Sequence, residues 1–314
     1  MKIKKAAALV LAVSLCGTMF GCQNSSQPAA SSQARFRAIR FLYLLLSFWA
    51  LTTIYPFFWV ILNSFRLKGL IRSDSFSIPF GNSFTLDNYK TAFERVDILS
   101  AYKNSMVIST AVTVAVLLLA GLAAYGMARY QFKGRGILYS LVIASMMFPV
   151  FSTVIPVFRM MFSWHIVNTD HLFLSQLSVI LPQIAGNLSF AMIVLTGFIR
   201  SLPIDLEEAA YLEGCSTYQI FFKIILPIAK PSFVTVAIFT FLWSYNDLFT
   251  QMFFLRYKDT FTITRLLSEI TSIAGVNYGL MAAAVVLVVV PVLAVYVILQ
   301  KNIIRGLTVG AIKG

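Results

Sequence analysis

Long apolar runs constrain the fold of this chain more than any other feature. There are six of them, and five contain no Asp, Glu, Lys or Arg, while the remaining one contains only Asp247. A run of about 20 apolar residues is long enough to cross a bilayer as a helix. Because lipid offers no hydrogen bonds to the backbone, we predict an all-α membrane protein with six transmembrane helices. The predicted spans are residues 41–62, 105–127, 137–158, 172–199, 231–255 and 278–300.

Composition supports a membrane location. The 314 residues are 59% hydrophobic and 12% charged, and the mean hydropathy is +0.81. A soluble domain carries about twice that charged fraction. The net charge of +13 is better explained by basic cytoplasmic loops than by nucleic-acid binding. Cys16, Cys22 and Cys215 are widely separated, so we expect no disulfide framework.

Basic residues in short loops predict the orientation. The loop 129–136 contains three Lys or Arg residues, whereas the loop 163–171 contains none. Further basic residues precede the first predicted span and follow the last. By the positive-inside rule, both termini of the bundle and the stretch 207–227 are therefore expected in the cytoplasm.

The first 34 residues do not fit this orientation. MKIKK is followed by an apolar run and by Cys22, as in a bacterial lipoprotein leader whose cysteine is lipidated. Processing there would leave the next residues outside the cell and invert every later loop. Either the leader is not processed, or it is a fusion or gene-model artefact. We therefore separate residues 1–34, a leader and polar tether, from a transmembrane domain at 35–314.

The stretch EEAAYLEGCSTYQIFFKIILP, residues 207–227, is polar between two apolar spans. Pro203 suits a first helical turn, and Gly214 suits the residue that ends a helix. Ser216 and Gln219 have the spacing of a capping box, which predicts a second helix, and Pro227 predicts its break. These signals indicate two short helices with a bend at Gly214. The alternative is an amphipathic connector that contacts only lipid headgroups.

The same stretch resembles the EAA loop of ABC importer permeases. The matching residues are Glu208, Ala209, Ala210, Gly214, Ile224, Leu226 and Pro227. Other segments resemble the carbohydrate-type family, in particular its smaller maltose-permease-like subunit. They are SFTLDNYKTAF, Asn104–Ser105, AAYGMARYQFKGR, SYNDLF and the terminal GAIKG. The chain departs from the family pattern at Glu213, Cys215 and Tyr245, where Asp, Ala and Trp are usual.

This resemblance, which covers residues 38–314, implies a type I importer fold whose 207–227 loop is a coupling helix for a separate ATPase. Glu208 would pair with a basic residue of that ATPase. The coupling residues implied are Glu207, Glu208, Ala209, Ala210, Gly214, Leu226 and Pro227. The chain end would reach between two ATPase subunits through Gly310, Lys313 and Gly314.

The resemblance also implies the partners. They are a second related permease, which completes a heterodimer, two ATPases, an extracytoplasmic sugar-binding protein and membrane lipids. The chain itself is expected in the inner membrane of a bacterium. ATP and Mg²⁺ would bind to the ATPases, because this chain has no phosphate-binding loop.

No residue pattern indicates catalysis or a metal site. His165 and His171 lack a third ligand at a suitable spacing. Tyr245, Asn246 and Asp247 near the outer end of the fifth span have a pathway or a packing role. Asp247 is equally compatible with a span that stops before it.

Two other function classes remain open. A self-contained secondary transporter would show internal repeats and more charges within its spans. A lipid-anchored sensor would use Cys22 but would have almost no soluble part. The favoured function is an ATP-driven importer subunit for a sugar or oligosaccharide, and the sequence does not name the sugar.

Overall fold

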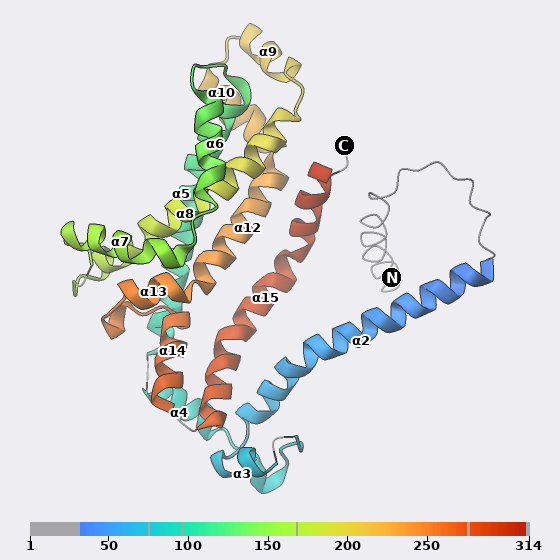
Figure 1. The fold of residues 1–314 in the computed structure, drawn as a ribbon, viewed down its shortest axis with the longest axis vertical. Coiled ribbons are helices and arrows are strands. Elements are labelled where there is room, and N and C mark those ends of the chain that lie inside the picture. The colour runs from blue at the N-terminus through green and yellow to red at the C-terminus, as the bar shows by residue number, and fades with distance from the viewer. Residues whose placement is uncertain (1–31, 75, 96, 168, 275–276, 312–314) are drawn as a thin grey trace. The chain divides into compact units, whose positions relative to one another are not determined.

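The computed structural model describes residues 32–311 apart from residues 75, 96, 168 and 275–276 (Figure 1). Within those residues the regular elements are helices, and the β pairing that occurs is an isolated bridge between Arg66 and Phe84. The predicted all-α class is confirmed. The chain forms two units, Met1–Pro56 and Phe57–Gly314. The expected boundary after residue 34 lies inside the first unit and stays a prediction.

The second unit is built around helix α5 (Ile98–Arg129). This helix packs against α8 (Leu172–Arg200) and α12 (Lys230–Asn246), and α12 packs against α15 (Tyr278–Ala311) (Figure 1). Residues spaced by four form one face of a helix, and on α5 such a face is fully buried. Its members are Ile108, Val112, Val116, Ala120 and Ala124. Small and β-branched side chains on this face let α5 approach its neighbours closely.

The third predicted span is not one straight helix. It divides into α6 (Arg135–Ser145) and α7 (Val150–Ser163), which are bent by 103°. Pro149 is the cap residue that precedes α7. A proline disfavours helical geometry in the residue before it, so α6 ends first and α7 starts in a new direction. The predicted span 137–158 is therefore a bent pair of helices, and whether the pair crosses the membrane as one span stays a prediction.

The fifth predicted span is also interrupted. Helix α12 ends at Asn246, and α13 (Leu248–Phe254) begins after Asp247. At its start, α12 is bent by 80° from the segment Thr217–Ile228, with the break at Ala229. Pro231 has no N–H and lies in the first turn of α12, where a proline is best tolerated, whereas Pro227 lies inside the segment Thr217–Ile228. The predicted break is therefore displaced by two residues.

The number of spans is only partly supported. Three helices of the described chain are long and apolar enough to cross a membrane, namely Ile39–Ser64, Ile98–Arg129 and Leu172–Arg200. Counting each bent pair as one span raises the number to five. The shorter apolar helix Tyr278–Ala294 falls within the sixth predicted span. All six expected segments thus contain helix, and the count of six stays a prediction.

A buried arginine organises the end of the unit opposite α9. The chain there contains α3 (Lys68–Ser73), η1 (Gly81–Ser83) and α4 (Asp87–Arg95). Arg66 is 1% exposed, and its guanidinium donates to the backbone carbonyls of Asp74 and Ser77. The amide of Asn88 donates to the carbonyls of Ser64 and Arg66, at 2.9 and 2.8 Å. These bonds close the loop between α2 (Ser32–Ser64) and α4 without a regular sheet.

The remaining connection runs from α13 to α15. It contains η3 (Lys258–Thr260) and α14 (Ile263–Ala274), and α14 packs on α15. The side-chain amide of Asn104 on α5 donates to the carbonyls of Asp259 and Phe261, at 2.8 and 3.1 Å. This connection is therefore attached to the central helix of the bundle.

Candidate functional site

The stretch that carries the sequence motif forms the predicted pair of helices. Helix α9 (Asp205–Leu212) ends at a left-handed residue, Gly214, whose φ is +81°. The N–H of Gly214 donates to the carbonyl of Tyr211, and the N–H of Cys215 donates to that of Ala210, both at 3.0 Å. This pair of bonds is the Schellman motif, which satisfies carbonyls at a helix end. The predicted bend at Gly214 is confirmed.

The second helix begins immediately after the bend. Helix α10 (Thr217–Ile220) starts with both bonds of the predicted capping box between Ser216 and Gln219. It continues through a π-helical turn, η2 (Phe221–Ile225), into α11 (Leu226–Ile228). The first helix, in contrast, begins at Asp205, two residues later than Pro203 suggests. We call residues 205–220 the α9–α10 loop.

Glu207 points into the protein. Its side chain is 5% exposed, and its two carboxylate oxygens bind Arg129 Nε and Tyr125 Oη, the latter at 2.9 Å. The same guanidinium donates from Nη2 to the carbonyl of Leu202, at 3.0 Å. Glu207 is therefore not on the exposed face of α9, and its expected role in coupling stays a prediction.

The outer face of α9 is exposed. Glu208 and Ala209 are exposed, and Leu212 has 90% of its surface accessible. Ile204, Glu208 and Leu212 are spaced by four, so they share one face of the helix. Ala210 lies on the other side and is only 5% exposed. The motif thus divides into an outward part at Glu208 and Ala209 and an inward part at Glu207 and Ala210.

Hydroxyl groups connect both helices of the α9–α10 loop to the end of α5. Tyr130 Oη lies 3.1 Å from Tyr211 Oη and 3.3 Å from Thr217 Oγ1, and the latter two atoms are 3.2 Å apart. The hydrogen bonds with Thr217 and Tyr211 lower the pKa of Tyr130. Tyr211 belongs to α9 and Thr217 to α10, so this triangle spans the bend.

Leu226 and Pro227 lie apart from the exposed face of α9 in the sequence and contribute to a different feature. They line an apolar groove of about 360 Å³ together with Leu117 of α5 and Phe233 of α12. Leu226 is half-buried and Pro227 is exposed. Their surroundings indicate packing at the start of α12.

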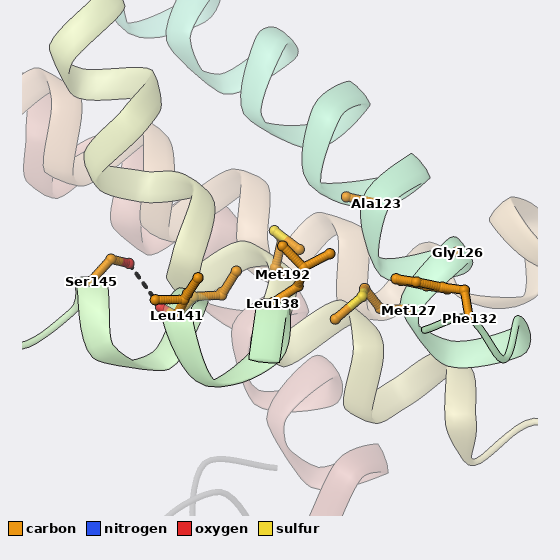
Figure 2. Close-up of a pocket in the computed structure, with 9 residues that line it drawn as sticks. Ala123, Gly126, Met127, Phe132, Leu138, Leu141, Ser145 and Met192 are labelled. Atoms are coloured by element: carbon orange, nitrogen blue, oxygen red, sulfur yellow. Dashed lines mark hydrogen bonds between the residues drawn. The ribbon is translucent and has the colours of Figure 1, made fainter. Parts of the chain in front are cut away.

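A larger apolar groove, of about 500 Å³, lies between α5, α6 and α8 (Figure 2). Phe132, Leu138, Leu141 and Met192 contribute to its lining. The hydroxyl of Ser145 is also present, but it is hydrogen-bonded to the carbonyl of Val142 and to the hydroxyl of Ser189. With few free polar groups, this groove does not have the chemistry to recognise a sugar.

Asp247 marks a helix junction. Its carboxylate caps α13 by accepting from the N–H of Thr250, at 3.0 Å, and it also accepts from Gln183 Nε2, at 2.8 Å. Tyr245 is 3% exposed and packs on Phe241. Asn246 is exposed and donates to the carbonyl of Leu242 of its own helix. All three side chains have local structural contacts, and the helix indeed stops before Asp247.

Several expected residues lie outside the described part of the chain. Cys22, Lys313 and Gly314 are not described, and Gly310 is placed only as a backbone position within α15. Their expected roles in lipidation and in ATPase contact stay predictions. Among the described residues, no three His, Cys, Asp or Glu side chains gather as metal ligands.

The sequence reasoning did not identify the partners of Glu207. Tyr125 and Arg129 are separated by four residues near the end of an apolar span, which places them on one face of a helix. A tyrosine and an arginine on one face at a membrane boundary favour a buried acidic partner, and the loop offers several. Which glutamate binds Tyr125 and Arg129 depends on the direction in which α9 leaves the end of α8.

The comparisons with known proteins agree with this architecture. The family model described as "Binding-protein-dependent transport system inner membrane component" matches residues 117–309. The diacetylchitobiose uptake system permease protein NgcG of Streptomyces coelicolor is 33% identical over 290 residues, covering 92% of this chain and 93% of that protein. The galactooligosaccharides transport system permease protein GanQ of Bacillus subtilis is 33% identical over 284 residues, covering 89% and 97%.

A solved structure has the same fold. The chain matches a bacterial ABC transporter involved in the import of the acidic polysaccharide alginate with a TM-score of 0.71 and 20% identity. The match covers 88% of this chain and 99% of that one. This chain therefore belongs to the binding-protein-dependent transport system inner membrane components, and it is a membrane-integral permease subunit of an ABC importer.

Proposed function

We propose that this permease imports a sugar or oligosaccharide and forms half of the pathway beside a second, related permease. Two ATPase subunits supply the energy and bind ATP and Mg²⁺, and an extracytoplasmic protein delivers the solute. The substrate class is supported by the named relatives, which serve diacetylchitobiose and galactooligosaccharide uptake. The family name supports the binding protein as a partner.

The exposed face of α9 is the proposed docking site for the ATPase, and its exposure is the observation that carries the proposal. Glu208 offers a carboxylate with no ion pair among the described residues, and Leu212 one turn later offers an apolar contact. Ala209 beside them permits close approach of another backbone. A partner cleft with a basic residue above an apolar pocket is complementary to this face.

The charge at this end of the bundle supports a cytoplasmic location. Exposed basic residues gather around the α9–α10 loop, as expected for the inner side of a bacterial membrane. They are Lys133, Arg200, Lys223 and Lys230. With an even number of spans, both termini of the bundle would be cytoplasmic, and Gly310, Lys313 and Gly314 would reach the ATPases.

The charge-reversing variant Glu208→Arg tests the docking site. We expect the amount of ATPase that co-purifies with the permease to fall roughly tenfold or more, because the partner's basic residue then meets a like charge. Glu94→Arg is the matched control. Glu94 is an exposed glutamate at the opposite end of the bundle, where its weak pair with Lys90 spans 3.9 Å. This control should retain the ATPase.

Equal ATPase retention by both variants would contradict docking at Glu208. The substrate class is tested separately, by uptake of radiolabelled N,N′-diacetylchitobiose, galactobiose and trehalose in cells with and without this permease. Permease-dependent uptake of at least one of these sugars is expected. Failure of all three would remove the support for this substrate class and leave the docking result intact.

A further inference from the structure

The end of α5 holds the α9–α10 loop through a buried ion pair. Arg129 is the last residue of α5, and Glu207 is in the first turn of α9. Their side chains are 10% and 5% exposed. A cation at a helix C-terminus and an anion at a helix N-terminus each complement the helix dipole, so both ends of this pair are favoured. Tyr125 Oη occupies the second oxygen of the carboxylate, at 2.9 Å.

The guanidinium of Arg129 joins two segments at once. Nε contacts Glu207, and Nη2 donates to the carbonyl of Leu202 in the turn between α8 and α9, at 3.0 Å. A lysine has a single nitrogen and cannot reproduce this fork. Because the carboxylate and the guanidinium are both buried, separating them would leave uncompensated charges, which is costly. The contact therefore resists being pulled apart.

Aromatic packing extends the same contact. The ring of Tyr125 lies 5.4 Å from that of Phe221 in η2 and 6.0 Å from that of Tyr130. Tyr130 also bonds to Tyr211 and Thr217 on the two sides of the bend. The α9–α10 loop is thus held to α5 at its start and at its bend. A displacement of α9 cannot occur without moving α5 unless these bonds break.

Helix α5 can pass such a movement on. Its fully buried face, from Ile108 to Ala124, lies against α8 and α12. Close-packed helices transmit displacement because they have no free volume to absorb it. A force applied at the exposed Glu208 thus has a continuous route into the bundle.

We propose that Glu207, Arg129 and Tyr125 form an internal clamp that transmits the movement of the docked α9 to α5. They are positioning residues, and this role rests on the proposed docking of the ATPase at Glu208. The two adjacent glutamates thus have different roles. Glu208 contacts the ATPase, and Glu207 attaches α9 to α5.

The test measures sugar uptake and ATP hydrolysis together, with the whole importer reconstituted in proteoliposomes. In Glu207→Gln, the ATPase should still co-purify and hydrolyse ATP, but uptake per ATP hydrolysed should fall about fivefold or more. Tyr125→Phe removes one hydroxyl and should lower the same ratio less. Glu94→Gln is the control, because Glu94 is an exposed carboxylate far from α9 at the opposite end of the unit, and its ratio should not change.

Two further variants separate coupling from folding. Glu207→Arg and Arg129→Glu alone should each lower the uptake per ATP hydrolysed. Combining them exchanges the two charges and should restore part of that loss. The double variant Glu207→Gln with Arg129→Gln leaves no unpaired buried charge, so its thermal unfolding midpoint should stay near that of the wild type while its ratio stays low.

A normal ratio in Glu207→Gln would overturn the clamp, as would a loss of uptake that only follows the amount of folded protein. Loss of the ATPase from Glu207→Gln would assign Glu207 to the docking surface instead, and the clamp would again be wrong. Failure of the docking proposal is tested separately with Glu208→Arg, which leaves Glu207 unchanged. Retention of the ATPase by that variant would contradict docking but not the contacts of the clamp.

Discussion

Glu207 and Glu208 are neighbours in the sequence but meet opposite environments. One is buried on Arg129 and Tyr125, and the other is exposed. Successive residues of a helix are about 100° apart, so adjacent side chains face different directions. Two adjacent glutamates of one motif can therefore have different roles, one inside the protein and one at its surface.

Gly214 is needed for its backbone conformation rather than for space. Its φ is +81°, and a side chain built there would have no neighbour within 4 Å. We expect Gly214→Ala to destabilise the bend by about 1–2 kcal/mol, because L-residues are strained in the left-handed region. Sugar uptake by the Gly214→Ala variant should also fall if the bend positions α9. Gly214→Asn should cost less, since asparagine tolerates this region.

Thermal unfolding of the purified permease and uptake in cells measure these two effects. If Gly214→Ala and the wild type agree in both, the left-handed bend is not required. If Asn is as harmful as Ala, backbone strain is the wrong reason.

At the scale of helices, the close approach of α5 and α12 depends on a glycine. A Cβ added to Gly121 would lie 2.8 Å from Cε1 of Phe233 and 3.4 Å from Cζ of Phe221. Both rings are buried and have little room to move. A Cβ added to Gly126, five residues later on the same helix, would have no such neighbour within 4 Å.

We therefore expect Gly121→Ala to lower the stability of the permease by about 1–3 kcal/mol through overpacking. Gly126→Ala should be neutral or slightly stabilising, because alanine is the better helix former. The unfolding midpoints of the two variants in detergent make the comparison direct. Similar midpoints would show that α5 and α12 can separate without cost.

At the scale of the whole molecule, orientation in the membrane is the property that function needs. Helix α5 has 32 residues, about 48 Å of helix, which is long enough for its two ends to reach opposite sides of a bilayer. Leu99 is exposed near its start, and Glu213 is exposed in the α9–α10 loop beyond its end. The proposed topology places Leu99 outside the cell and Glu213 in the cytoplasm.

Single cysteines test this topology. In a chain with its natural cysteines replaced, we expect Leu99→Cys to react with a membrane-impermeant maleimide in intact cells. Glu213→Cys should react only in inverted vesicles. The reverse pattern would place the α9–α10 loop outside, where no cytoplasmic ATPase can dock, and the proposed function would be wrong.

The sequence by itself determined the helical class, the six apolar segments, the glycine bend and the capping box at Ser216. These features depend on interactions between residues close together in the chain, or on the contrast between lipid and water. The residues of the EAA motif were also visible, because their identities and spacing form a local pattern.

Only the tertiary structure decided which glutamate is buried, where the third and fifth segments bend, and that Asp247 caps a helix and binds Gln183. The burial of Glu207 depends on Arg129, which is 78 residues away in the chain, and the bond between Asp247 and Gln183 joins residues 64 apart. The bends lie beside Pro149 and Pro231, which are local signals, but hydropathy alone did not place them. Hydropathy reports how apolar a segment is, but it has no term for what the segment packs against. That is the physical reason why the helices and the glycine bend were predictable and the contacts between distant helices were not.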